Sequence, residues 1–461
     1  MKRLVVLCDG TWETALFQAE EARLTNVSRI ANAILPLDGQ KTPALPQVKL
    51  YLPGLGTGQE LAMGIVEGAL GDGLLADIRL AYYFIAQNWS PGDEASATSP
   101  HSPRDSPNDP PVSLLWQIFL FGFSRGAYIA RLLLTLISII GILSPRDNLH
   151  MFPEAVRLLC SHRDGLSSKA QRNQAELDDL LQEIAPARLG GKMTAGPIVT
   201  AVVLFDTVPL LHQFERSPFG TDNAALESDT CHFVVQALSA YEARAAFRPV
   251  ILRRHPEARR QVLIQVYFPG CHTDIGGGYP EHDLSDLTLH FVVGLIADKL
   301  ALDLRYLAGI SGAALAPWGG ATTHVGVHLS HGHPRHLPTV MQSSQAPTFE
   351  TFHPSLLEQL PASWPRELRP LLPVLRASRT DPSATGAWWR LTQWEEEMRR
   401  QWPVRRNERP SLPSASNATA PGDDRQHARS SRRLDRLTSF MRYSEEKIAG
   451  AGDSFSLSRS R

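Results

Sequence analysis

Short apolar runs recur along the chain, separated by polar stretches and by longer amphipathic segments. Each run is continuous rather than alternating, which is typical of strands that are buried on both faces of a parallel sheet. The runs are Leu4–Leu7, Val48–Leu52, Ile118–Phe121, Ile198–Phe205 and Val262–Phe268.

Segments with helical periodicity lie between these runs. This order predicts an α/β fold: a mostly parallel sheet with helices on both faces. Thr25 and Asn26 precede the first such segment and suit a helix N-cap. The predicted helices are Val27–Leu35, Leu74–Asn88, Ala127–Ile140, Ala175–Ile184, Phe233–Ala246 and Leu284–Leu300.

Two segments have no apolar period. Residues 95–113 are crowded with Ser, Pro, Asp and Asn, which predicts a disordered surface insertion. Residues 401–461 carry twelve Lys or Arg against seven Asp or Glu, which predicts a disordered, mildly basic tail. An alternative for the tail is a short amphipathic helix over 434–441 that transiently touches a membrane surface or a partner. Residues 1–400 are then expected to form the catalytic domain.

Composition narrows the function classes. The 461 residues are 43% hydrophobic and 20% charged with a net charge of -1, so a core-forming protein is expected and nucleic acid is not expected as a partner. The four cysteines lack the spacing of a zinc module or a disulfide scaffold. The longest apolar stretch, Leu132–Leu143, is too short for a transmembrane helix, and the N-terminal run is too short for a signal peptide. A cytoplasmic protein is expected.

The pentapeptide Gly122–Gly126 reads G-x-S-x-G, with Ser124 at its centre. A predicted strand precedes it and a predicted helix follows it, which is the context of the nucleophile elbow in α/β-hydrolases. Ser124 is therefore the expected nucleophile. The N–H of Arg125, at the start of the helix, and the loop residues Gly10 and Thr11 are expected to bind an oxyanion or to line the cleft.

A catalytic serine needs a histidine base and a carboxylate that orients it. Asp274 follows the Val262–Phe268 run, two predicted strands after Ser124, and is the expected acid; Asp206, directly after the Ile198–Phe205 run, is the alternative. Several histidines could act as the base, and spacing alone does not choose among them. The His-rich segment 324–336 has no interleaved carboxylates, so no metal site is predicted.

Several sequence blocks resemble, in the same order, a largely uncharacterised α/β-hydrolase family whose best-understood members are phospholipase effectors of type VI secretion systems. The match runs from Leu4 to about Tyr279 and more loosely to Leu357. The blocks are Cys8–Trp12, Thr25–Val27, Tyr51–Gly58, Phe121–Ala127, Phe205–Val208, Ala237–Ser239 with Glu242 and Arg244, and Pro269–Tyr279.

The resemblance implies a serine hydrolase of carboxylic esters with lipids or phospholipids as substrates and no cofactor. It also favours His353 as the base, because Phe352–Leu356 is similar to a motif of this family; His272, within the Gly-rich block, is the alternative. The competing interpretation of the chain is a catalytically inactive interaction protein that retains the fold.

Overall fold

The computed structural model describes residues 2–10, 23–54, 68–89, 117–161, 168–184, 199–209, 216–227, 230–258, 261–311, 348–359, 364–381 and 388–401. The chain divides into two units, Met1–Val404 and Arg405–Arg461, and the described residues lie in the first. The predicted insertion 95–113, the tail after Gln401, Thr11 and the His-rich segment fall outside the described residues.

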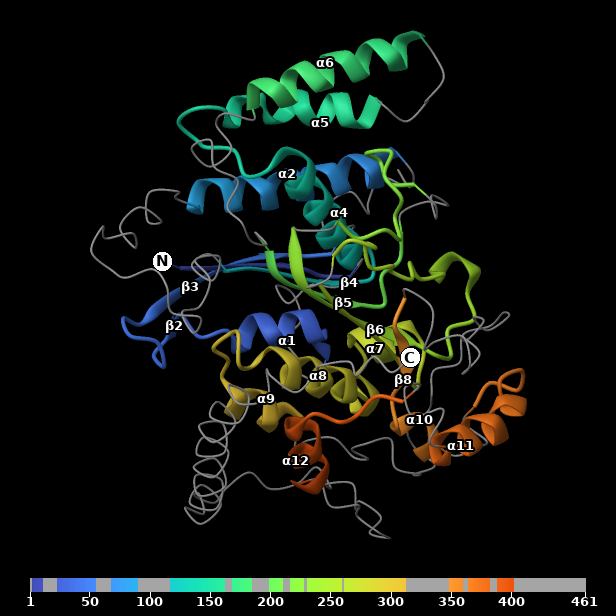
Figure 1. The fold of residues 1–461 in the computed structure, drawn as a ribbon. Coiled ribbons are helices and arrows are strands. Elements are labelled where there is room, and N and C mark those ends of the chain that lie inside the picture. Colours follow the sequence, from blue (N-terminus) through green and yellow to red (C-terminus); the bar gives the residue numbers. More distant parts are fainter. Residues whose placement is uncertain are drawn as a thin grey trace, which may run out of the picture. The chain divides into compact units, whose positions relative to one another are not determined.

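An eight-stranded sheet forms the centre of the first unit, in the order β2-β3-β1-β4-β5-β6-β7-β8 (Figure 1). All neighbouring strands are parallel except β2 and β3, which are antiparallel. The α/β fold with a mostly parallel sheet is confirmed. The strands are β1 (Arg3–Cys8), β2 (Leu37–Asp38), β3 (Leu45–Leu52), β4 (Gln117–Phe123), β5 (Val199–Phe205), β6 (Cys231–Ser239), β7 (Val262–Phe268) and β8 (Glu350–Phe352).

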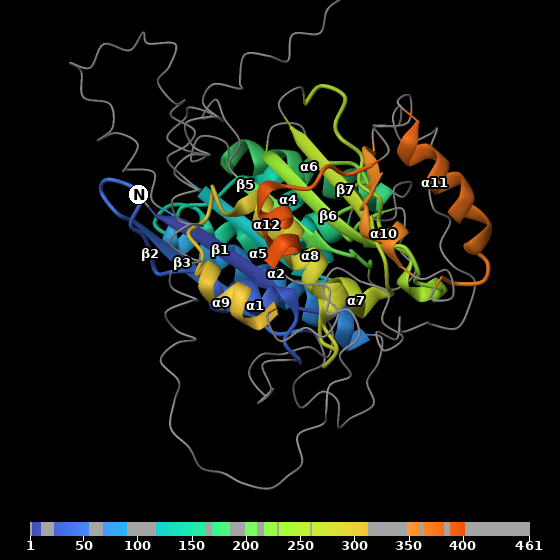
Figure 2. The ribbon, with the colours of Figure 1, turned by 90° about the horizontal axis from the view of Figure 1, so that it is seen from below.

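Helices cover both faces of the sheet (Figure 1). The first face carries α2 (Gly68–Asn88) and α4 (Arg125–Ile140), with α5 (Phe152–Ser161) and α6 (Ser168–Ile184) further out. The second carries α1 (Asn26–Ala33), α7 (His272–Gly276) and α8 (Asp283–Ile296), with α9 (Leu304–Ser311) and α12 (Gln393–Gln401) outside them (Figure 2). The helices α10 (Ser355–Glu358) and α11 (Leu372–Thr380) lie near the β8 edge.

The central strands are buried because both sheet faces pack against helices. All six residues of β1 are buried, and the main core joins the central strands to apolar side chains of α2, α4 and α5. Thr25 caps α1 as predicted, since its side chain accepts a hydrogen bond from the backbone N–H of Ser28. The continuous apolar runs of the central strands thus mark strands that have no face toward solvent, whereas β3, near the sheet edge, is only partly buried.

One predicted helix is wrong. Residues 233–246 were expected to be helical, but Cys231–Ser239 is strand β6, paired with β5 on one side and β7 on the other. A continuous apolar run in a two-sided strand has no period of two, so it cannot be told from a buried helix by pattern alone. This extra strand changes the position of every carboxylate that follows it.

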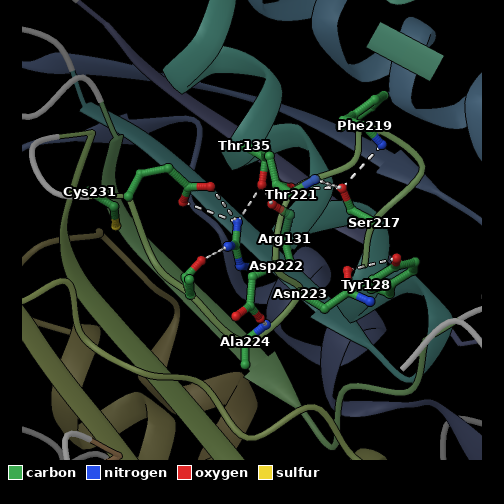
Figure 3. A network of polar contacts seen from close by, with 12 residues as sticks. Tyr128, Arg131, Thr135, Ser217, Phe219, Thr221, Asp222, Asn223, Ala224 and Cys231 are labelled. Atoms are coloured by element: carbon green, nitrogen blue, oxygen red, sulfur yellow. Dashed lines mark hydrogen bonds and ion pairs between the residues drawn. The ribbon is translucent and has the colours of Figure 1, made fainter. Parts of the chain in front are cut away.

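Helix α4 is fixed to the segment between β5 and β6 by a buried network (Figure 3). Arg131, 2% exposed, bonds both carboxylate oxygens of Glu227 at 2.9 and 3.1 Å and the Thr135 hydroxyl at 2.5 Å, and it also donates to the Ala225 carbonyl. One turn earlier, the Tyr128 hydroxyl donates to Asn223 at 3.0 Å. The helix that follows Ser124 therefore has a fixed position against its neighbours.

Candidate active site

Ser124 occupies a sharp turn between β4 and α4. Its backbone has φ 57° and ψ -122°, in the region that L-residues other than glycine rarely adopt. The turn is held because the Ser124 N–H donates to the Phe205 carbonyl at 2.9 Å. Such local strain is common where a side chain must be presented for chemistry. The predicted sequence of strand, tight turn and helix is present.

The two glycines of the pentapeptide allow three elements to pack closely at this turn. A Cβ atom on Gly122 would lie 2.4 Å from the Cα of Ala127, and one on Gly126 would lie 2.2 Å from the Cys8 carbonyl oxygen. Both distances are far below a van der Waals contact, so no larger residue fits without a backbone shift. The glycines thus bring α4 onto β4 and onto the end of β1.

A continuous line of hydrogen bonds joins Ser124, His272 and Asp206. His272 Nε2 lies 2.7 Å from Ser124 Oγ, and His272 Nδ1 lies 2.7 Å from Asp206 Oδ2. The three residues are 4%, 3% and 0% exposed, so little water competes for these bonds. Along the chain they follow the order Ser, Asp, His, as in α/β-hydrolases.

The parallel sheet brings these residues together because they all follow the carboxyl ends of strands. Ser124 comes directly after β4 and Asp206 directly after β5, while His272 opens α7 shortly after β7. In the register of the sheet, Phe123 pairs with Phe205 and Ser239 pairs with Phe268, so the strand ends are aligned. Loops at one edge of the sheet then meet, as expected for an open α/β fold.

Residues at the end of β6 support the acid and the histidine from behind. The Ser239 N–H donates to Asp206 Oδ1 at 3.0 Å, and a carboxylate oxygen of Glu242, a residue with 0% exposure, accepts the His272 N–H at 3.2 Å. The rings of Phe123 and Phe247 flank the His272 ring, with centroids 4.8 Å away in each case. Ser239 and Glu242 were singled out only by the family resemblance and not as site residues.

The structure does not bring Asp274 and His353 to Ser124, contrary to the sequence expectation. Asp274 lies in the first turn of α7, where its Oδ2 accepts the Cys271 N–H at 2.8 Å. His353 follows β8 and is fully buried; its Nδ1 lies 2.7 Å from Ser355 Oγ and its Nε2 lies 3.1 Å from Glu395 Oε1. Burial lowers the pKa of His353, although Glu395 opposes this shift. The physical reason lies in the strand order: Asp206 ends the strand next to β4, the loop after β7 brings His272 rather than Asp274 to Ser124, and His353 follows β8 at the edge of the sheet.

The residues expected to bind an oxyanion have different environments. The Gly10 N–H donates to Asp9 Oδ1 at 2.8 Å and is therefore already engaged. Arg125 is the first residue of α4, where backbone N–H groups have no partner within the helix and point toward the turn. Of the two, the Arg125 N–H is the donor that this geometry leaves to a ligand at Ser124.

Asp9 is a buried carboxylate beside the Ser124 turn. Its Oδ2 accepts hydrogen bonds from the hydroxyls of Thr25, Ser28 and Tyr51 at 2.8, 2.7 and 2.6 Å. Burial raises the pKa of Asp9, and these bonds oppose the shift. Three blocks of the family resemblance thus meet at one carboxylate, which fixes the loop after β1.

The described residues contain no group of three or more His, Cys, Asp or Glu side chains arranged to hold a metal ion. None of the described helices combines the length and the apolar character required to cross a bilayer.

Comparisons with known proteins identify the family. The sequence model of the family described as "T6SS, Phospholipase effector Tle1-like, catalytic domain" matches residues 2–294, and the chain belongs to this family. No curated protein matches the chain.

Two solved structures are similar to this chain. The first is a Tle1 effector bound to the VgrG spike of the type 6 secretion system, with 20% identity, TM-score 0.30 and coverage of 60% of this chain and 51% of that one. The second is an uncharacterized protein from Pseudomonas aeruginosa, with 16% identity, TM-score 0.37 and coverage of 86% and 65%. The chain thus spans about half the length of that Tle1 effector.

Proposed function

We propose that this member of the Tle1-like phospholipase effector family is a serine hydrolase that cleaves carboxylic esters of phospholipids. The observation that carries the proposal is the line of short hydrogen bonds from Ser124 through His272 to Asp206. A serine, an imidazole and a buried carboxylate in this arrangement are the parts of a catalytic triad. Family membership supports the choice of a lipid substrate.

In the proposed reaction, His272 Nε2 accepts the proton of the Ser124 hydroxyl while Oγ attacks the acyl carbonyl. Asp206 accepts a hydrogen bond from the Nδ1–H group, which keeps Nε2 free to act as a base and stabilises the imidazolium that forms. The Arg125 N–H donates to the oxyanion of the tetrahedral intermediate. When the intermediate collapses, the proton on His272 passes to the leaving alcohol and an acyl group stays on Ser124.

Water completes the cycle. His272 removes a proton from a water molecule, which attacks the acyl-enzyme, and the second tetrahedral intermediate releases a carboxylic acid and restores the Ser124 hydroxyl. Each step uses side chains and a backbone N–H group of this chain together with water. The strained backbone of Ser124 holds Oγ at the strand end for both attacks.

The chain offers a matched control for this proposal. A second line of hydrogen bonds also joins a serine, a histidine and an acid. In this line His353 lies 2.7 Å from the Ser355 hydroxyl and 3.1 Å from a carboxylate oxygen of Glu395. All three residues are fully buried, so a substrate cannot reach Ser355. Reactivity toward an ester should therefore distinguish the two lines even though their chemistry is similar.

The test uses a fluorophosphonate probe, which labels activated serines, together with hydrolysis of a short-chain phospholipid. The parent protein should be labelled, Ser124→Ala should lose labelling and turnover, and Ser355→Ala should keep both. Residual turnover of Ser124→Ala is expected about 10³–10⁶-fold below the parent. A parent protein that neither reacts with the probe nor hydrolyses any ester would support an inactive interaction protein instead.

A further inference from the structure

Arg125 follows Ser124 directly, and its side chain has no partner among the described residues. It is partly buried at the start of α4. Within the described part of the chain, its guanidinium makes no hydrogen bond and no ion pair. Arginine side chains removed from water normally obtain both, because desolvating an unpaired charge is costly.

Arg131, two turns along the same helix, shows the ordinary arrangement. It is more deeply buried than Arg125, and it bonds Glu227, Thr135 and a backbone carbonyl (Figure 3). Within the described part of the chain, the helix thus carries one arginine with bonded partners and one without.

The carboxylates around the Ser124 turn are engaged by other groups. Asp206 bonds His272 and Ser239, and Asp9 bonds three hydroxyls and the Gly10 N–H. Glu242 holds Arg244 through two bonds of 2.9 and 2.8 Å. Among the described residues, the Arg125 guanidinium therefore has no counter-charge, and its backbone directly follows the proposed nucleophile.

Burial lowers the pKa of Arg125, because the charged guanidinium is partly removed from water. An anion bound beside Ser124 would supply the missing partner. In a glycerophospholipid the ester and the phosphate are carried by one glycerol unit, so a negative charge accompanies the reacting carbonyl into the site. Guanidinium groups match phosphate oxygens with two parallel donors.

We propose that the Arg125 side chain binds the phosphate of the phospholipid substrate and thereby selects phospholipids over neutral glycerides. The inference rests on the proposed ester hydrolysis at Ser124. It gives the side chain of Arg125 a role in substrate specificity, in addition to the proposed hydrogen bond from its backbone N–H to the oxyanion.

Arg244 is the matched control. Its guanidinium stacks on Phe247, which in turn contacts His272, so it too is a cation close to the site. Unlike Arg125 it is already neutralised, because Glu242 lies 2.8 Å from its Nη2. Arg244→Gln should therefore leave phosphate selectivity nearly intact.

The experiment compares kcat/KM for dioctanoyl-phosphatidylcholine with kcat/KM for dioctanoylglycerol, which has the same acyl groups and no phosphate. A charged hydrogen bond contributes about 1.5–3 kcal/mol, so the ratio should fall about 10- to 100-fold in Arg125→Gln. It should stay within about threefold of the parent in Arg244→Gln. Losses of chemistry that are common to both substrates cancel in the ratio.

Arg125→Lys keeps the charge and loses the planar fork, so an intermediate ratio is expected. That variant decides the case if the Gln variant does not fold, because an unchanged ratio in Arg125→Lys would then count against the proposal.

A binding measurement separates this inference from the proposed function. Calorimetric titration with a short-chain diether phosphatidylcholine, which has no ester to cleave, should give weaker binding to Arg125→Gln by a similar factor even if no ester is hydrolysed. Equal affinity, an unchanged substrate ratio, or an equal fall in Arg244→Gln would overturn the proposal. Displacement of the diether lipid by inorganic phosphate with equal potency would also overturn it, since the site would then recognise free phosphate rather than a lipid.

Discussion

Asp206→Asn is the most informative substitution, because the geometry dictates how the new side chain must lie. The Ser239 N–H bonds one oxygen of Asp206, and His272 Nδ1 faces the other. In the variant, the amide oxygen should remain on the Ser239 N–H, and the amide NH₂ group then faces His272. Nδ1 must become an acceptor, which moves the ring hydrogen to Nε2.

A hydrogen on Nε2 points at Ser124 Oγ, 2.7 Å away, and the histidine can no longer remove the serine proton. The wrong tautomer in a serine hydrolase costs on the order of 10⁴ in kcat, which corresponds to about 5 kcal/mol in the barrier. We expect a loss of this size in the turnover of a short-chain phospholipid. KM and the denaturant midpoint should change little, because the shape of the side chain is retained.

Asp274→Asn is the control for this prediction. The Oδ2 atom of Asp274 accepts the Cys271 N–H within the first turn of α7, and an amide oxygen can take over that bond. The variant should keep kcat within about tenfold, with a stability loss of about 1 kcal/mol, typical of a weakened helix cap. If Asp274→Asn lost turnover 10⁴-fold and Asp206→Asn retained it, the reasoning from the hydrogen-bond line would be refuted.

Three further predictions concern stability. Burial lowers the pKa of His290 from 6.5 to about 4, and its Nδ1 accepts the Trp394 N–H at 3.0 Å, so the unfolded chain binds its proton first on acidification. The parent should therefore lose up to about 3 kcal/mol more than His290→Gln between pH 7 and pH 4 in denaturant titrations, and equal losses would contradict this. Because the pKa of Asp9 is raised, the folded state holds the carboxyl proton more tightly than the unfolded chain does. The stability of the parent minus that of Asp9→Asn should therefore fall as pH rises from about 3.9 through the raised pKa. A difference that grows with pH would show that the hydrogen bonds outweigh burial. Gly126→Ala should lower stability by about 1–3 kcal/mol and slow fluorophosphonate labelling, because its Cβ would meet the Cys8 and Asp9 carbonyl oxygens; an unchanged melting temperature would refute the close packing.

Local features of the sequence predicted the Ser124 turn well. Two glycines, a preceding apolar run and a following helical pattern lie within one short stretch, and the structure has β4 and α4 where they were expected. Five of the strands follow from continuous apolar runs for the same reason. Such signals depend on neighbours in the chain, so no long-range information is needed.

Which residues lie beside Ser124 depends on the number of strands in the sheet. That number depends on whether one ambiguous apolar run is assigned as a helix or as a strand. With Phe233–Ala246 assigned as a helix, Asp274 seemed to follow the second strand after Ser124. With β6 in the sheet, Asp206 ends the neighbouring strand and the β7 loop supplies the histidine rather than the acid. Val234 and Val235, both β-branched, were the available signal for a strand.

His353 was expected to be the base because its local motif is similar to one of the family, but its contacts are different. Its two ring nitrogens bond Ser355 and Glu395, and Glu395 also accepts the Trp389 and Thr392 N–H groups. These bonds tie the end of β8 to α12. A histidine that ties β8 to α12 and a histidine beside Ser124 look alike in a sequence, and only the fold shows which partners each ring meets.

The wide separation of the three site residues along the chain has a consequence during protein synthesis. Ser124 and His272 are 148 residues apart, and Asp206 and His272 are 66 apart. The N-terminal part of a chain leaves the ribosome first, and strands that pair over long distances assemble late. A nascent or prematurely terminated chain that lacks β7 would thus carry Ser124 without His272. Under the proposed function, Ser124 becomes reactive only after translation has passed His272 and the sheet has formed.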